Sequence, residues 1–159
     1  GRPDPQYKVS RKAITAWRTL GGLNSLIFWL IPLFYFLFLL GGVLPWWGFY
    51  TLLGIAVINS ILAIFVLPPL RWRHWAYEIF QNEVYLKHGI LVIRKTLIPT
   101  PRVQHVDTRQ GPILRDLKLA SVTIYTAATV HEIPCLEENL AEDIRDQIST
   151  IASQETEDV

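Results

Sequence analysis

The side chains that could do chemistry in this chain are few and widely spaced. Those that could bind a metal ion are four histidines and a single cysteine: His74, His88, His105, His131 and Cys135. No two of them stand at the short intervals that zinc sites use, and histidines in strands are more often structural. We therefore predict no metal site and no cofactor.

A hydrolytic centre has equally little support. Ser121, His131 and Asp116 supply the residue types of a catalytic triad, but the glycines of a nucleophile elbow do not accompany the serine. The paired acids Glu137-Glu138 and Glu142-Asp143 stand at the start of a predicted helix, where capping and the helix dipole explain them. We expect no catalytic residue and a protein that is not an enzyme.

Basic side chains are better placed for binding. Lys87, Arg94, Lys95 and Arg102 lie in successive predicted strands and could attract a lipid head group. From His74 onward, however, eight Lys and Arg stand against 13 Asp and Glu, a net charge of −5. An anionic surface repels such a domain as a whole, so we favour a protein ligand over a lipid.

The segment from Arg102 to Val106 breaks the alternation of a regular strand, because Val103 and Val106 cannot both point inward. A β-bulge resolves the conflict, and bulges often re-aim a strand edge. This segment and the connection from Gly111 to Lys118 form the predicted recognition surface, although closure of the sheet alone explains the bulge equally well. The contact candidates are Lys95, Arg102, Gln104, His105, Gln110 and Arg115.

The elements that carry these residues follow a membrane segment. Between Thr19 and Leu70 the chain has no Lys, Arg, His, Asp or Glu, as membrane-spanning helices require. We expect spans from Leu20 to Leu44 and from Trp47 to Leu67, a turn at Pro45 to Gly48, and a stop at Pro68-Pro69. The first run is too long for a signal peptide.

Basic residues flank this hairpin at both outer ends and are absent from its turn. They are Arg2, Lys8, Arg11, Lys12 and Arg18 on one side and Arg71 and Arg73 on the other. The positive-inside rule therefore places both termini in the cytoplasm, and the basic belt should attract anionic lipid. Since no ionisable residue lies within the spans, we do not expect transport.

One face of the second span carries small and polar residues, namely Ala56, Asn59, Ser60 and Ala63. Such faces let helices approach closely in lipid. Pro32 frees the carbonyl of Phe28, and Asn59 lies at the depth to donate a hydrogen bond to it. The face therefore packs either on the first span or against another membrane subunit.

Short strand patterns separated by Gly, Pro and Asn turns begin after the hairpin. The expected strands are Trp75–Phe80, Glu83–His88, Ile90–Ile98, Arg102–Gln110, Ser121–Ala127 and Val130–Pro134. An amphipathic helix should follow, with Asn139 as its N-cap and Leu140, Ile144, Ile148 and Ile151 on its apolar face. This is the plan of a small α+β antiparallel barrel with a C-terminal helix.

The strand segments also resemble a known family. The blocks Trp75–Ile79, Arg102–Val106, Gln110–Leu119 and Val122–Ala127 are similar, in order and spacing, to the YdbS-like bacterial membrane proteins with a pleckstrin-homology (PH)-like domain. One departure is Ala128, where such proteins often have glycine. The resemblance implies a PH-like barrel, a larger sibling protein with repeated PH-like domains, and a role in envelope stress and tolerance of membrane-active peptides. It supplies no catalytic residues.

We therefore expect a membrane α-helical hairpin of two transmembrane helices followed by a PH-like antiparallel barrel. The expected divisions are a basic juxtamembrane segment (1–19), the hairpin (20–70), a cytoplasmic PH-like domain (71–152) and an acidic tail (153–159). The expected function is a non-enzymatic subunit of the bacterial cytoplasmic membrane that contacts lipids and binds the larger sibling or further copies of itself, not nucleic acid. Through such an assembly it would protect the envelope against antimicrobial peptides. A lipid head-group sensor and a lipid-modifying enzyme are the alternatives.

Labelling of cysteines tests the orientation of the hairpin. A membrane-impermeant maleimide added to intact cells should label a cysteine placed at Gly48 of a Cys135→Ser variant, because the turn is expected outside. It should not label the native Cys135, which is expected inside. The opposite labelling pattern would contradict the cytoplasmic placement of both termini.

Overall fold

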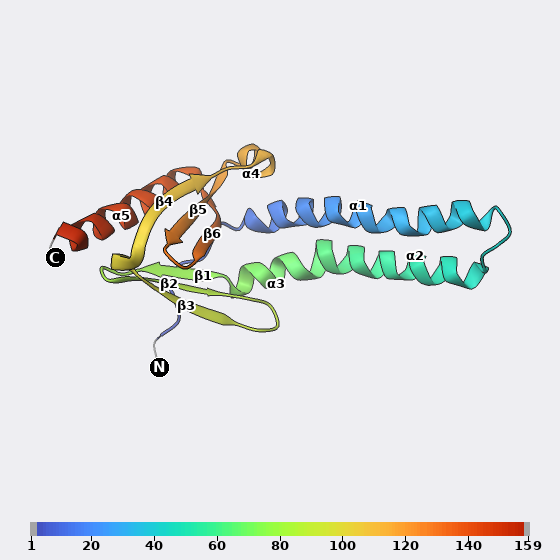
Figure 1. The fold of residues 1–159 in the computed structure, drawn as a ribbon, viewed down its shortest axis with the longest axis horizontal. Coiled ribbons are helices and arrows are strands. Elements are labelled where there is room, and N and C mark those ends of the chain that lie inside the picture. The colour runs from blue at the N-terminus through green and yellow to red at the C-terminus, as the bar shows by residue number, and fades with distance from the viewer. Residues whose placement is uncertain (1–2, 158–159) are drawn as a thin grey trace. The chain divides into compact units, whose positions relative to one another are not determined.

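The computed structural model describes residues 3–157, which form two compact units (Figure 1). One unit comprises residues 17–69 and holds the apolar hairpin. The other combines the chain up to Ala16 with the chain from Leu70 onward, and it holds the strands and the C-terminal helix. The residues before the hairpin therefore fold with the domain that follows it.

Two long helices form the hairpin. The first is α1 (Ala13–Leu39), and the second runs from Trp46 to His74 as α2 (Trp46–Ile61), a π-helical turn η1 (Leu62–Val66) and α3 (Leu67–His74). Both are long and apolar enough to cross a membrane. Their outward apolar side chains are exposed, as is the case for Phe38 at 67%. Lipid is the environment in which such exposure is favourable.

The predicted stop at Pro68-Pro69 is wrong, because the helix continues through both prolines to His74. Pro68 has no N–H to donate to the carbonyl of Ile64, four residues earlier. Arg18 supplies the missing donor, since its Nε lies 3.2 Å from that carbonyl oxygen. The π-helical turn just before the prolines also accommodates part of the change in helical hydrogen bonding that the prolines impose.

The small face of the second helix packs within the hairpin. Ala56 is only 2% exposed, and a side chain at Gly21 of α1 would overlap the backbone of Ala63. Trp29 Nε1 donates a hydrogen bond to Ser60 Oγ over 2.8 Å. Ser60 thus bonds to α1 at this depth, while the bond from Asn59 to the carbonyl of Phe28 stays a prediction.

The turn of the hairpin is packed more tightly than the sequence indicates. Tyr35 donates a hydrogen bond from its hydroxyl to the carbonyl of Pro45 over 2.7 Å, and its ring fills the space above Gly48. A cysteine at Gly48 would collide with that ring. Val43, which is 83% exposed, is the better position for an accessibility label, and the label there reports the orientation by itself, because Cys135 is only 3% exposed.

The domain consists of two antiparallel sheets of three strands each (Figure 1). The first sheet has the order β1 (Ala76–Ile79), β2 (Glu83–His88), β3 (Arg94–Pro99), and the second has β4 (Val103–Arg109), β5 (Leu119–Thr126), β6 (Val130–Glu137). The short helix η2 (Thr100–Arg102) joins them, α4 (Pro112–Asp116) precedes β5, and α5 (Glu138–Glu157) ends the described chain.

This arrangement confirms the PH-like plan and corrects several of its details. The two sheets do not pair with each other, so they do not close into a barrel. β3 begins at Arg94 rather than Ile90, and the expected loop from Gly111 to Lys118 contains α4. α5 begins at Glu138, which places Asn139 inside its first turn rather than at the N-cap. It also includes the residues expected as a tail up to Glu157; residues 158–159 lie outside the described chain.

The core of the domain lies between the sheets and α5. Leu86, Ile124 and Ile133 are at most 1% exposed. On α5, which contacts β4, β5 and β6, Ile144 is 4% exposed and Ile148 is 0% exposed. Of the predicted apolar face of α5, Leu140 is 41% exposed and Ile151 is half-buried. Two central residues of that face therefore hold the helix on the sheet.

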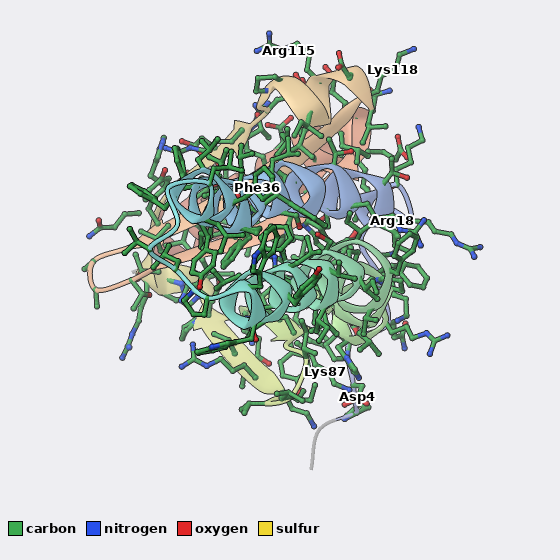
Figure 2. The ribbon with its side chains drawn as sticks, turned by 90° about the vertical axis from the view of Figure 1, so that its right-hand side faces the viewer. Asp4, Arg18, Phe36, Lys87, Arg115 and Lys118 are labelled. Carbon is green, nitrogen blue, oxygen red and sulfur yellow. The ribbon has the colours of Figure 1, made fainter. Side chains whose placement is uncertain are left out.

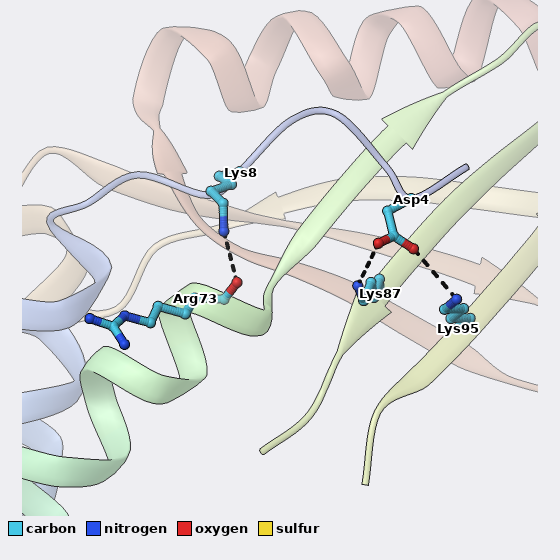
Figure 3. Close-up of polar contacts among 5 residues, drawn as sticks. All are labelled: Asp4, Lys8, Arg73, Lys87 and Lys95. Carbon is cyan, nitrogen blue, oxygen red and sulfur yellow. Dashed lines mark hydrogen bonds and ion pairs between the residues drawn. The ribbon is translucent and has the colours of Figure 1, made fainter. Parts of the chain in front are cut away.

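Residues 4–12, which we call the strap, add to the first sheet and cross to the second. The backbones of Tyr7 and Tyr77 exchange hydrogen bonds of 3.1 and 2.7 Å, so the strap covers the edge of β1. The backbone N–H of Ser10 donates to the carbonyl of Cys135 in β6 over 3.0 Å. Two basic residues of the predicted lipid belt bind other parts of the protein here. Lys8 Nζ donates a hydrogen bond to the carbonyl of Arg73 over 2.7 Å (Figure 3), and Lys12 Nζ lies 3.8 Å from a carboxylate oxygen of Glu137.

A pair of glycines tests the packing of the hairpin. Gly21→Ala should destabilise the protein by about 1–3 kcal/mol, because the new methyl group overlaps the backbone of Ala63. Gly54→Ala is the matched control, since a Cβ there meets no atom within 4 Å. Thermal unfolding in mild detergent should separate the two variants. Equal melting temperatures would contradict the close approach of the helices at Gly21.

Candidate functional site

A groove of about 540 Å³ opens where the two sheets fail to pair. We call it the seam groove. Its lining residues are Leu97, Ile98 and Pro99 of β3, Pro101, Arg102, Gln104, His131 and the β5–β6 turn from Thr126 to Thr129. In the described chain β3 and β4 are each paired on one side only, so both present a strand edge near this groove.

The predicted bulge in β4 is confirmed and borders this groove. The register with β5 shifts between Val103 and His105, which leaves Gln104 without a paired residue. Gln104 is exposed and lines the seam groove. It also lines a second hollow of about 360 Å³, shared with Ser149 and Ser153 of α5. The bulge thus directs one polar side chain toward two concave surfaces.

The structure brings three of the six predicted contact residues together. Arg102 and Gln104 line the seam groove, and His105 lines the neighbouring hollow. The ring centroids of His105 and Tyr125 are 5.3 Å apart, and His105 Nε2 lies 3.6 Å from Asp107 Oδ2. The other three lie elsewhere.

Gln110 has a structural role, because its Nε2 donates to the carbonyl of Leu119 over 2.9 Å. Arg115 projects outward from α4, as does Lys118 just after it (Figure 2). Lys95 lies near the other end of β3 from the groove, where its Nζ is 3.4 Å from a carboxylate oxygen of Asp4 (Figure 3). None of the three borders the seam groove.

The four basic residues that could read a lipid head group do not share one pocket. Lys87 and Lys95 are paired across β2 and β3, and both bind Asp4 of the strap, at 3.0 and 3.4 Å. The hydrogen bond and charge of Lys87 lower the pKa of the Asp4 carboxyl below its ordinary value. Arg102 follows the opposite end of β3.

Several lining residues of the groove were missed by the sequence reasoning, which searched for charged and titratable groups. Leu97 is 42% exposed although it lies in a strand, and Thr129 bonds both Thr126 and His131. Those bonds hold the β5–β6 turn in one shape. The one available signal was the adjacent apolar pair Leu97-Ile98, because alternating burial lets only one of them reach the core.

The residues that could take part in catalysis are mostly hydrogen-bonded within the sheet, buried or distant from one another. Ser121 is buried and accepts a hydrogen bond from the N–H of Cys135. Ser121 and His131 lie three β5 positions apart, because His131 pairs with Ile124, and that separates them by roughly 10 Å. Burial raises the pKa of the Cys135 thiol to about 11, which keeps it protonated.

Two histidines are also shifted toward their neutral forms. Burial lowers the pKa of His131. The pKa of His88 is lowered mainly by burial and, to a smaller extent, by the nearby positive charge of Arg94. His88 stacks on the ring of Trp75 at 5.1 Å. Within residues 3–157, no three His, Cys, Asp or Glu residues gather as metal ligands would.

Known proteins are similar to this chain over part or all of its length. The family model described as "Bacterial PH domain" matches residues 25–151. UPF0699 transmembrane protein YdbS of Bacillus subtilis (strain 168) is 36% identical over 164 residues, which cover 99% of each chain. UPF0699 transmembrane protein YdbT of the same organism is 28% identical over 74 residues, covering 45% of this chain and 15% of that protein. No solved structure matches the chain.

These matches confirm the resemblance read from the strand blocks. They also agree with the two apolar helices, because the similar proteins are transmembrane proteins by name and the family model includes most of the hairpin. The chain therefore belongs to the UPF0699 family of membrane proteins and carries a bacterial PH domain.

Proposed function

We propose that this protein is a non-enzymatic subunit of a bacterial membrane complex and that its PH domain binds a protein partner through the seam groove. The observation that carries the proposal is the groove itself, with exposed apolar and polar side chains beside two strand edges. A peptide segment in extended conformation can pair with such an edge while its side chains enter the adjacent hollow.

The partner we propose is a larger membrane protein of the same family. The similar proteins YdbS and YdbT are both from Bacillus subtilis (strain 168), and the match covers only 15% of the length of YdbT. Residence in one membrane would raise the local concentration of both proteins. A second copy of this chain would meet the same conditions and is the alternative partner.

Two further parts of the proposal rest on the sequence. The basic residues at the outer ends of the hairpin support a cytoplasmic PH domain. The family resemblance supports a role of the assembled complex in protecting the envelope against membrane-active peptides. Against an enzymatic role, the buried Ser121 and the protonated Cys135 thiol are held within the sheet rather than in the groove.

Copurification with the larger relative from the same genome tests this proposal. The full chain and the relative are coexpressed and purified in mild detergent, and binding is compared for wild type, Arg102→Glu and Gln104→Ala. Each variant should weaken binding about tenfold if these side chains lie at the centre of the contact.

Matched controls use the same residue types away from the groove. The control variants are Arg109→Glu and Gln81→Ala. Arg109 lies at the far end of β4, and Gln81 lies in the exposed β1–β2 turn. Both should bind as wild type does. Equal loss in the groove and control variants, or no copurification of wild type with the relative or with a tagged second copy, would argue against the groove as an assembly site.

A further inference from the structure

The connection between β2 and β3, residues 89–93, presents an apolar surface to solvent. We call it the β2–β3 tip. Leu91 is 97% exposed, Val92 76% and Ile93 38%. The sequence pattern predicts that these residues continue the strand, yet they lie beyond the sheet, and Leu91 and Val92 leave most of their surface exposed. Consecutive exposed apolar side chains of this kind mark a contact surface in a soluble domain.

The tip has a specific backbone shape. Gly89 has a φ of +134°, and a Cβ at this position would collide with the carbonyl oxygen of Val92. Only glycine permits such a close turn. This turn projects Leu91 and Val92 away from the sheet, as their exposure shows.

The register of the sheet places the tip at the end where the chain leaves the hairpin. Ala76, the first residue of β1, pairs with Lys87, one residue before the end of β2. The ring of Trp75 stacks on that of His88 at the base of the tip. Residues 70–75 directly continue the second apolar helix. The tip and the entry point from the membrane segment therefore share one end of the domain.

A second element with similar chemistry lies at this end. Lys12, just before the start of α1, is 3.8 Å from Glu137, and Glu137 pairs with Leu119 at the start of β5. α4 precedes β5 directly, so it also lies near the end of the domain from which the chain continues into α1. Arg115 of α4 and Lys118 just after it are exposed and point outward (Figure 2).

Charge is distributed unevenly between this end and the rest of the domain. Arg94 and Lys95 follow the tip directly and both are exposed, with Lys95 also paired to Asp4 of the strap. The acids that give the domain its negative sum are concentrated on α5, for example Glu142 and Asp146, and this helix extends away to pack on η2. Apolar side chains with flanking basic residues suit the interfacial layer of an anionic bilayer.

We propose that the β2–β3 tip inserts into the interfacial layer of the bilayer that the chain itself spans. Leu91 and Val92 enter the boundary between head groups and acyl chains, and Arg94 contacts the lipid phosphates. Arg115 of α4 and the following Lys118 belong to the same surface. The insertion fixes how the PH domain stands on the membrane, and it is independent of any partner in the seam groove.

Fluorescence quenching in proteoliposomes tests the proposal on the full-length protein. A Val92→Cys variant is labelled with an environment-sensitive fluorophore and reconstituted in phosphatidylcholine containing phosphatidylglycerol, with a fraction of lipids spin-labelled at a shallow acyl carbon. The native Cys135 is 3% exposed and does not compete for the label. We expect a blue-shifted emission and strong quenching.

The matched control places the label at Asn82 in the exposed β1–β2 turn, at the opposite end of the same sheet. Its emission should be neither shifted nor quenched. Adding Leu91→Asp to Val92→Cys should reduce the quenching to the level of this control while leaving the melting temperature unchanged, because Leu91 is almost fully exposed. Arg94→Glu should reduce quenching in liposomes with phosphatidylglycerol and leave it unchanged in pure phosphatidylcholine.

Three results would overturn the proposal or part of it. Absence of both shift and quenching at Val92 would show a tip in water. A blue shift that the lipid quenchers do not affect would show a tip covered by protein, such as a second copy. Quenching that is equal in both lipid mixtures and insensitive to Arg94→Glu would remove the role of the basic residues.

Discussion

The attachment of the strap to the strands is the constraint on which the rest of the domain depends. Val9 is 2% exposed, its carbonyl accepts a hydrogen bond from Trp72 Nε1 over 3.0 Å, and Tyr7 pairs with Tyr77. These bonds join the residues before the hairpin to those after it in one compact unit. A folded domain cannot be divided by a bilayer, so both ends of the hairpin must emerge on the same side of the membrane.

The same attachment explains an irregularity in β6. Cys135 has a φ of +56°, which is unusual for a residue with a side chain, and it lies where two residues of β6 face the single Ser121 of β5. This bulge turns the carbonyl of Cys135 toward the N–H of Ser10. Ser121 in turn accepts the N–H of Cys135. The backbone strain at Cys135 is therefore balanced by hydrogen bonds that hold the strap.

Sequence patterns predict most of this fold because the signals are local. A run without charge predicts the two spans, and strand periodicity together with turn residues finds all six strands. The predictions that fail concern features that depend on residues distant in the sequence. The helix continues through Pro68, for example, because Arg18 supplies a hydrogen-bond donor. The segment from Ile90 to Ile93 reads as a strand, since an apolar run does not reveal whether it meets a protein core or lipid. The seam groove is lined largely by uncharged residues and arises from sheets that do not close.

The net charge of the domain is a poor guide to what each part of it contacts. Salt screens charges over about 8 Å at physiological ionic strength, so acids on α5 have little influence at the far end of the domain. β3 connects the two surfaces considered above, with the tip before Arg94 and the groove at Leu97 to Pro99. A strand of this length separates its ends by roughly 17 Å. One end of β3 can therefore rest in the lipid interface while the other end stays accessible to a protein partner, and a single rigid strand would set the distance at which that partner is held from the membrane.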